Sequence, residues 1–265
     1  MPLAVQQIRR MRGGAQAHLM RCDDAGYYVV KFQNNPQGTR ILANELLGTR
    51  LAARMGLPVP AIAIVEVRED LIAQTEDLVI QLGRGRTPCR AGLQFGSRYP
   101  GHPADTAVHD FLPDEQLRDV MNLADFCGMF VFDKWTCNTN GRQAVFCRAP
   151  GDARYRAWMI DQGFCFNAGE WNFPDAPLRG IYARHRVYES VRGLESFEPW
   201  LARIERNMTE QVFDDILKEI PGEWYGCDTD AIEQLLEHLL RRRKLVPQLV
   251  TSTWKSSLQP FSNWK

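Results

Sequence analysis

The chain has 265 residues, which is enough for one large domain or for two lobes. Hydrophobic residues make up 45% and charged residues 24%, as in ordinary soluble globular proteins, and the formal net charge is +0. This balance gives no reason to expect nucleic acid as a partner, and the absence of an apolar run near roughly 18 residues argues against a bilayer span.

The N-terminal region predicts strands separated by short turns. Residues 5–11, 17–23 and 27–32 have the composition of strands, and the stretch CDDAG supplies the hairpin turn between the last two. A helix is predicted over residues 39–56. Thr39 is placed to cap its start, and Gly56 is placed to end it.

Strands also dominate the next stretch. Residues 61–67 are rich in β-branched side chains, which favours a strand. Residues 68–112 have no clear period, but 78–83 and 91–97 are candidate strands. A helix is then predicted over residues 114–132. Its expected buried stripe consists of Leu117, Val120, Met121, Ala124, Cys127 and Val131.

A β-hairpin and a helical region complete the chain. The hairpin is formed by residues 142–148 and 155–160, and from about residue 196 the pattern is helical. Asp230 is placed to cap the clearest of these helices. The basic run 241–244 is expected to be a solvated helix end rather than a nucleic-acid patch.

The order of elements predicts an α+β protein with two lobes. A β-rich N-lobe with one helix covers residues 1–100, and a mostly helical C-lobe covers 101–265, including the hairpin 143–161. A cleft between the two lobes is the expected site. The seven cysteines form no C-x-x-C pair, so neither a zinc site nor a disulfide framework is predicted, and we expect a reducing, cytoplasmic setting.

Two stretches in the N-lobe suit the binding of phosphate groups. The turn RGGAQA carries Gly13 and Gly14, which let backbone N–H groups approach phosphate oxygens, although a plain hairpin turn explains the same residues. Lys31 lies on an apolar strand. It either protects a sheet edge from pairing with another strand or binds the phosphates of a nucleotide. Glu45 lies on the half-apolar face of the predicted helix and is expected to hold Lys31, unless it is solvated.

Three polar residues mark the C-lobe part of the predicted site. Asp133 follows the buried helix, Asn138 comes five residues later, and Asp161 follows the return strand of the hairpin in an Asp-x-Gly sequence. Antiparallel pairing brings the two ends of the hairpin together. Carboxylate and carboxamide oxygens at one place suit Mg²⁺, although turn formation explains each residue separately. Together these parts fit phosphoryl transfer from ATP.

The sequence resembles the short, stand-alone members of the HipA-like kinase family, a bacterial family related to protein and lipid kinases. The similar stretches include DKWTCNTNGRQAVF at 133–146 and MIDQGFCFNAGEWNFPDAPLRGIY at 159–182, and together with 13–38, 44–60 and 235–246 they span most of the chain. The resemblance implies a bilobal protein-kinase-like fold. Trp135 stands where better-known members carry a histidine.

The resemblance also implies a role for each candidate residue. Asp133 would be the catalytic aspartate, and Asn138 and Asp161 would bind Mg²⁺. Lys31, held by Glu45, would contact the phosphates of ATP beneath a loop formed by Gly13, Gly14, Ala15 and Gln16. Adenine is expected near residues 95–99.

The implied activity is transfer of the γ-phosphate to a hydroxyl of a protein Ser or Thr, or of a small molecule. Two alternatives are a nucleotide-binding pseudokinase or scaffold without turnover, and transfer of AMP by the same fold.

Overall fold

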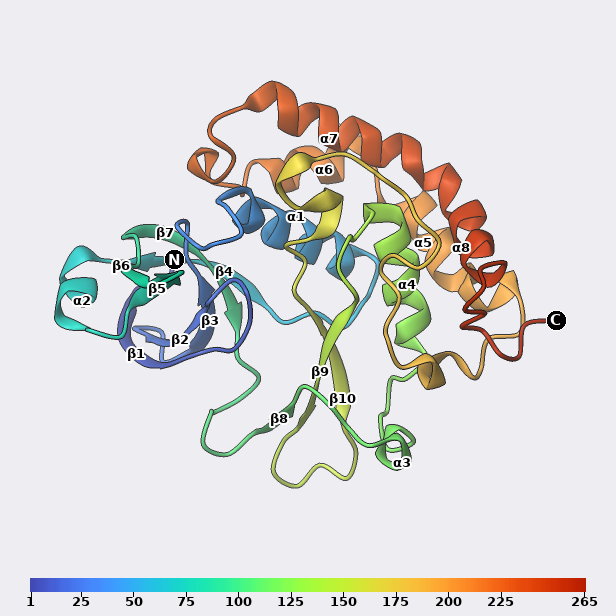
Figure 1. Cartoon of the computed structure of the whole chain (residues 1–265), viewed down its shortest axis with the longest axis horizontal. Coiled ribbons are helices and arrows are strands. Elements are labelled where there is room, and N and C mark those ends of the chain that lie inside the picture. Colours follow the sequence, from blue (N-terminus) through green and yellow to red (C-terminus); the bar gives the residue numbers. More distant parts are fainter.

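Five antiparallel strands form the main sheet of the computed structural model, which describes residues 1–265 (Figure 1). Their order across the sheet is β1-β2-β3-β7-β4. Because β3 lies in the middle, edge protection cannot explain the lysine at its end. The strands are β1 (Ala4–Arg10), β2 (His18–Cys22), β3 (Tyr27–Lys31), β4 (Ile62–Val67) and β7 (Gly92–Arg98).

The side chains of β3 alternate between the two faces of the sheet. Tyr28 and Val30 are buried in a small apolar cluster on one face, and Lys31 lies on the other face. Helix α2 (Glu69–Gln74) and the separate hairpin of β5 (Val79–Leu82) and β6 (Gly85–Pro88) follow β4. The candidate strands at 78–83 and 91–97 are thus confirmed.

Helix α1 (Arg40–Arg54) connects the sheet to the rest of the molecule. Its buried apolar residues, apart from Ile41, belong to the same large cluster as the C-terminal helices, and none belongs to the cluster of the sheet. Gly56 follows the helix with φ +72°, as expected of its terminal glycine. Thr39 precedes the helix, but its hydroxyl donates to the carbonyl of Gln33 instead of capping. The division of the chain at residue 100 stays a prediction.

The helix predicted over residues 114–132 is two helices. α3 (Asp114–Leu117) and α4 (Asp125–Thr136) are separated by turns, and Met121, predicted to be buried, is 51% exposed. α4 is apolar on all sides and buried along almost its whole length, which is the pattern of a central helix. It also continues past Phe132 to Thr136, which determines where Asp133 lies.

The predicted hairpin is confirmed as β9 (Gln143–Arg148) and β10 (Arg156–Ile160). The strands pair antiparallel, with Gln143 opposite Ile160, and β8 (Ala107–His109) pairs with the other edge of β9. Figure 1 shows this hairpin between the N-terminal sheet and the C-terminal helices. The carboxyl end of β10 therefore points toward α1.

The rest of the chain is mostly helical, as predicted. α7 begins at Thr229, and its capping carboxylate is that of Asp228, not Asp230. Arg242, expected in a solvated run, is buried. No helix combines the length and the apolar character needed to cross a membrane. The helices are α5 (Glu198–Asn207), α6 (Glu210–Leu217), α7 (Thr229–Arg242) and α8 (Val246–Trp254), with short 3₁₀ helices between β10 and α8.

Replacement of Gly128 by alanine tests the packing of α4. Gly→Ala normally stabilises a helix by about 1 kcal/mol, but a Cβ at this position would overlap the indole of Trp200 on α5. We therefore expect Gly128→Ala to lower the free energy of unfolding by about 1–3 kcal/mol in urea titrations. Gly85→Ala, whose Cβ would have its nearest neighbour at 3.5 Å, should change it little. Equal stability of both variants would contradict this packing.

Candidate active site

A cavity of about 920 Å³ lies between the N-terminal sheet and the β9–β10 hairpin. This volume is in the range of sites that bind small molecules and cofactors. Lining residues come from the glycine-containing loop before β2, from β3, α1 and β7, and from both strands of the hairpin. The lining residues include Gly13, Gly14, Ala15, Gln16, Lys31, Glu45, Thr139, Asn140, Gln143, Val145 and Asp161.

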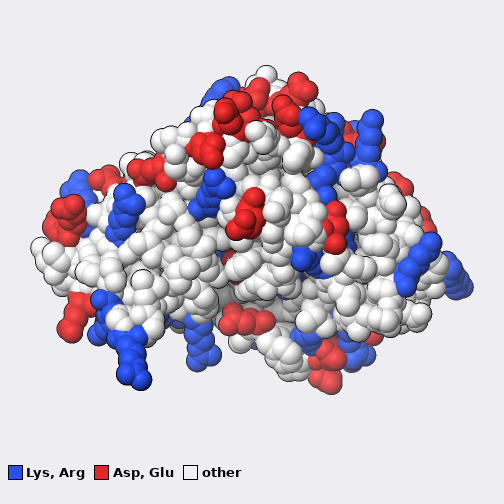
Figure 2. All heavy atoms as spheres, turned by 45° about the horizontal axis from the view of Figure 1, so that its top comes forward, with Lys and Arg blue, Asp and Glu red and all other residues white.

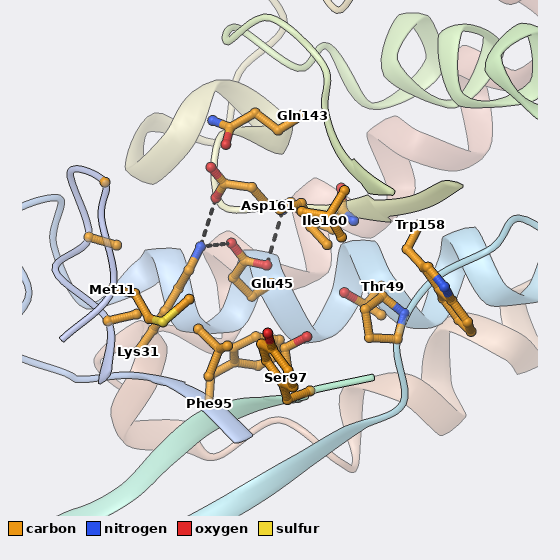
Figure 3. A pocket seen from close by; sticks show the side chains of 18 of the residues that line it. Met11, Lys31, Glu45, Thr49, Phe95, Ser97, Gln143, Trp158, Ile160 and Asp161 are labelled. Carbon is orange, nitrogen blue, oxygen red and sulfur yellow. Dashed lines mark hydrogen bonds and ion pairs between the residues drawn. The ribbon is translucent and has the colours of Figure 1, made fainter. Parts of the chain in front are cut away.

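Three charged residues meet at one end of the cavity (Figure 3). Lys31 of β3 donates to the carboxylate of Glu45 on α1, and its Nζ lies 2.7 Å from Oδ1 of Asp161, which follows β10. The predicted pairing of Lys31 with Glu45 is therefore present. Asp161 has φ +63°, a conformation that places its carboxylate back toward the sheet instead of continuing the strand.

Glu45 is the anchor of this group. Besides Lys31, its carboxylate accepts the backbone N–H groups of Gln162 at 3.0 Å and Gly163 at 2.9 Å. Its side chain is 3% exposed, so these three partners of a buried charge explain how the charge is tolerated. A Cβ on Gly163 would lie 2.7 Å from the side chain of Ile41, so the close approach requires glycine.

The same contacts set the protonation of Lys31 and Asp161. Burial would lower the pKa of Lys31, but the carboxylates of Glu45 and Asp161 raise it above its ordinary value. Burial would raise the pKa of Asp161, but Lys31 brings it below its ordinary value. The end of the cavity therefore carries a fixed ammonium and an ionised carboxylate at neutral pH.

Asp133 lies in a different place from the one expected. It is 0% exposed inside the last turn of α4, where Arg142 donates to both of its oxygens, with Nε 2.8 Å from Oδ2. Asn138 donates to Oδ1 of Asp133 at 3.0 Å. Arg142 also donates to the carbonyl of Ile160 at 2.7 Å, so the ion pair holds the loop after α4 against the end of β10.

Neither Asp133 nor Asn138 lines the cavity. Asn138 is 1% exposed, and its Oδ1 accepts the backbone N–H of Asn140 at 3.0 Å. The sequence predicted that Asp133, Asn138 and Asp161 bind one cation together. Instead, Arg142 links Asp133 to the end of β10, next to Asp161. The roles predicted for Asp133 and Asn138 stay predictions, and this placement does not support them, because their polar atoms are already used within the protein.

The residues after α4 that do line the cavity are Thr139 and Asn140 of the loop and Gln143 at the start of β9. Sequence reasoning passed over them because it ended the helix before Asp133, whereas α4 continues to Thr136. One signal was present in the sequence. Gln143 begins the strand that pairs with the residue before Asp161, so hairpin register alone places it next to that carboxylate.

The glycine-containing loop also lines the cavity, as predicted. Gly13 has φ +121°, which other residues rarely adopt. The side chain of Gln16 does not face a ligand. It pairs with the backbone of Gln81 on β5, accepting its N–H at 2.7 Å and donating to its carbonyl at 2.8 Å. This residue fixes the loop to the β5–β6 hairpin.

The region expected to meet adenine lies on the cavity wall. Phe95, Ser97 and Tyr99 line it, and Trp158 of β10 lines the same cavity. Figure 3 shows Phe95 and Ser97 on the sheet side, with Trp158 beyond Thr49. Aromatic and small polar side chains are the usual lining of a site for a planar ligand.

A family model described as HipA-like kinase matches residues 5–147, more than half of the chain. No curated protein matches. Among solved structures, the proinflammatory kinase CtkA of Helicobacter pylori is similar with a TM-score of 0.59, 15% identity and 97% coverage of each chain. Hydra Fam20 with sugar has a TM-score of 0.56, 12% identity and coverage of 97% of this chain and 87% of that one.

The Golgi casein kinase with Mn/ADP bound is a further structural relative. Its TM-score is 0.50 at 11% identity, and the match covers 98% of this chain and 74% of that one. These likenesses establish a kinase fold.

Removal of the Asp133 carboxylate tests its structural role. Asp133→Ala leaves the buried guanidinium of Arg142 unpaired, so we expect the free energy of unfolding to fall by about 3–5 kcal/mol. The double variant Asp133→Leu/Arg142→Met removes both charges of the pair, so its free energy of unfolding should fall by less. Urea titrations measure both. A single variant with unchanged stability and selectively lost turnover would instead support the catalytic role predicted from the sequence.

Proposed function

We propose that this chain, which belongs to the HipA-like kinase family, is an ATP- and Mg²⁺-dependent phosphotransferase. The γ-phosphoryl group of ATP passes to a hydroxyl acceptor, with Ser or Thr of a protein as the first candidate and a small molecule as the other. The single observation that supports it most is the meeting of Lys31, Glu45 and Asp161 at the end of a nucleotide-sized cavity.

Each of these residues has a task in phosphoryl transfer. Lys31 binds the α- and β-phosphates as a point charge, and Glu45 keeps its ammonium group in place. The loop formed by Gly13, Gly14, Ala15 and Gln16 covers the phosphates. The backbone N–H of Gln16 donates to the carbonyl of Gly13 at 3.2 Å, so the N–H groups of the three residues before it bind the phosphates. Phe95 to Tyr99 and Trp158 hold the adenine. The protein contributes mostly position and charge, which is what this reaction needs.

The donor set fits a magnesium ion. Mg²⁺ in phosphotransferases is held by one or two carboxylates, and waters and phosphate oxygens complete its shell. Asp161 offers an ionised carboxylate that is 22% exposed, and Figure 3 shows the amide of Gln143 beside it. We assign these two residues as the protein ligands. When bound, the ion neutralises charge on the phosphates. The Mn/ADP complex of the Golgi casein kinase is consistent with this assignment.

The charged side chains on the face shown in Figure 2 are consistent with the proposed partners, which are a nucleotide and a protein or small-molecule acceptor. Acidic and basic side chains both occur across the face shown in Figure 2, and neither sign covers it. A nucleic-acid partner requires a basic stripe or patch. This face has no such patch, so we propose neither nucleic acid nor a membrane as a partner. All seven cysteines are free, which supports our proposal of a reducing, cytoplasmic setting.

A second candidate function is nucleotide binding without turnover. It is favoured by the burial of Asp133, because the loop after α4 then offers no carboxylate to an acceptor. AMP transfer is the third candidate, since it would use the same metal ligands.

Labelled ATP distinguishes the three functions. Incubation of the protein with Mg²⁺ and either α- or γ-labelled ATP, followed by separation of products, should release or transfer label from the γ position only. Transfer of α label would establish AMP transfer instead. Binding of ATP in calorimetry with no label transferred from either position would establish a nucleotide-binding protein without turnover.

Asp161→Asn tests the metal site. Asparagine tolerates the positive φ of this position, so the fold should persist while the charged ligand is lost. We expect the Kd of Mg-ATP to rise about 10-fold or more, and the thermal stabilisation by Mg-ATP to shrink accordingly. Asp110→Asn removes another cavity-lining carboxylate and should preserve the dependence on Mg²⁺. Unchanged Mg-ATP affinity in Asp161→Asn would exclude this residue as the ligand.

A further inference from the structure

The segment that follows Asp161 has no exposed hydroxyl group that could be phosphorylated. Residues 162–182 include neither serine nor threonine, and their one tyrosine, Tyr182, is 7% exposed. The next serine in the chain is Ser190, which lies beyond the 3₁₀ helix η2 (His185–Tyr188). In kinases that are switched by phosphorylation, a phosphate added to this segment orders it by pairing with arginines. The order of the segment therefore comes from other contacts here.

An ion pair between the segment and α7 supplies the first of these contacts. The guanidinium of Arg242 donates to both carboxylate oxygens of Asp175, at 2.8 and 2.7 Å, and lies 4.3 Å from the ring centre of Phe173. Two parallel N–H groups on one carboxylate form strong, directional hydrogen bonds. The side chain of Arg242 is 8% exposed and that of Asp175 is 33% exposed, so salt screens this pair less than it screens a surface pair.

The last turn of α4 supplies the second contact. The ammonium of Lys134 donates to the carbonyls of Ala176 at 3.0 Å and Pro177 at 2.7 Å, the two residues that follow Asp175. The carbonyl of Lys134 in turn accepts a hydrogen bond from Arg242 at 3.0 Å. One guanidinium thus joins the carboxylate of the segment to the end of the helix that carries Asp133.

The segment also packs directly on Asp133. A Cβ on Gly180 would overlap the side chain of Asp133, so only glycine allows the backbone to pass there. The carbonyl of Ile181 accepts the backbone N–H of Arg142 at 3.3 Å. Thr139 lies between Asp133 and Arg142 in the chain and lines the cavity. A shift of the segment would therefore move the wall of the cavity that the loop after α4 forms.

We propose that Asp175 does permanently what an added phosphate does in kinases switched by phosphorylation, and that turnover needs no phosphate on residues 162–182. This inference rests on the proposed function. Asp175 is a positioning residue, because neither it nor Arg242 lines the cavity. Its carboxylate pairs with a guanidinium that burial would leave uncompensated. The pair keeps the segment, the end of α4 and the following loop in one arrangement. Turnover depends on this arrangement, whereas Mg-ATP binding depends on Lys31 and Asp161.

Asp175→Asn tests this with γ-labelled Mg-ATP as the probe and water as the acceptor. The amide keeps the size of the side chain but cannot accept from both N–H groups of the guanidinium. We expect phosphate release to slow at least about 10-fold, because small displacements caused far from the reacting atoms have effects of this size or larger. The Kd of Mg-ATP should not change. Glu237→Gln removes the partner of Arg241, the neighbour of Arg242 on α7, and should leave the rate unchanged.

Two further variants separate this role from a purely structural one. Asp175→Ser should be slow, and phosphoserine at the same position should restore the rate, because its phosphate offers oxygens to the same guanidinium. Ser190→Ala removes the next serine in the chain and should keep the full rate. Melting temperatures of all variants show which of them keep the fold.

The proposed function and this inference fail in different ways. If the wild-type protein binds no Mg-ATP in calorimetry, or releases no phosphate, the proposed function fails and the inference fails with it. If the wild type is active, a full rate in Asp175→Asn overturns the inference alone. The same conclusion follows if Ser190→Ala loses the rate at an unchanged melting temperature, or if phosphoserine does not restore the rate of Asp175→Ser.

Discussion

The buried carboxylate of Glu45 is the contact on which the candidate site depends. A charge withdrawn from water is tolerated only when it is paired and hydrogen-bonded. Glu45 achieves this with a lysine from the middle of the sheet and with two backbone N–H groups from the turn after β10. The requirement to satisfy one carboxylate therefore fixes a strand, a helix and a hairpin end relative to one another. It also leaves Lys31 and Asp161 facing the cavity.

A second buried ion pair organises the other wall. Asp133 and Arg142 neutralise each other at 0% side-chain exposure, and Arg142 reaches on to the end of β10. The pair acts on the cavity only indirectly. It holds the loop after α4 against the end of β10. In this arrangement Asn140 and Gln143 line the cavity. The charged pair of Asp133 and Arg142 thus supports the site, and the neutral side chains of Asn140 and Gln143 line the cavity.

Several parts of the site follow from local patterns. Strand alternation places Lys31 on the face opposite Tyr28 and Val30, and helical spacing places Glu45 on the buried face of α1. The register of a simple hairpin brings Asp161 next to the first residue of β9. These predictions succeeded because each depends on a repeat of two or of about four residues, which a sequence displays directly.

The end of α4 shows what local patterns leave open. Arg242, more than a hundred residues away, donates to the carbonyls of Lys134 at 3.0 Å and Trp135 at 2.9 Å, and the indole of Trp135 donates to Leu239. These contacts satisfy carbonyls of the last turn that have no partner within the helix, so the helix includes Asp133 and extends to Thr136. The sequence by itself predicted the main strands, helix α1, the β9–β10 hairpin and the pairing of Lys31 with Glu45, and its family resemblance implied the kinase-like arrangement. Only the tertiary structure decided which polar residues of the loop face the cavity, because contacts from a distant helix set where α4 ends.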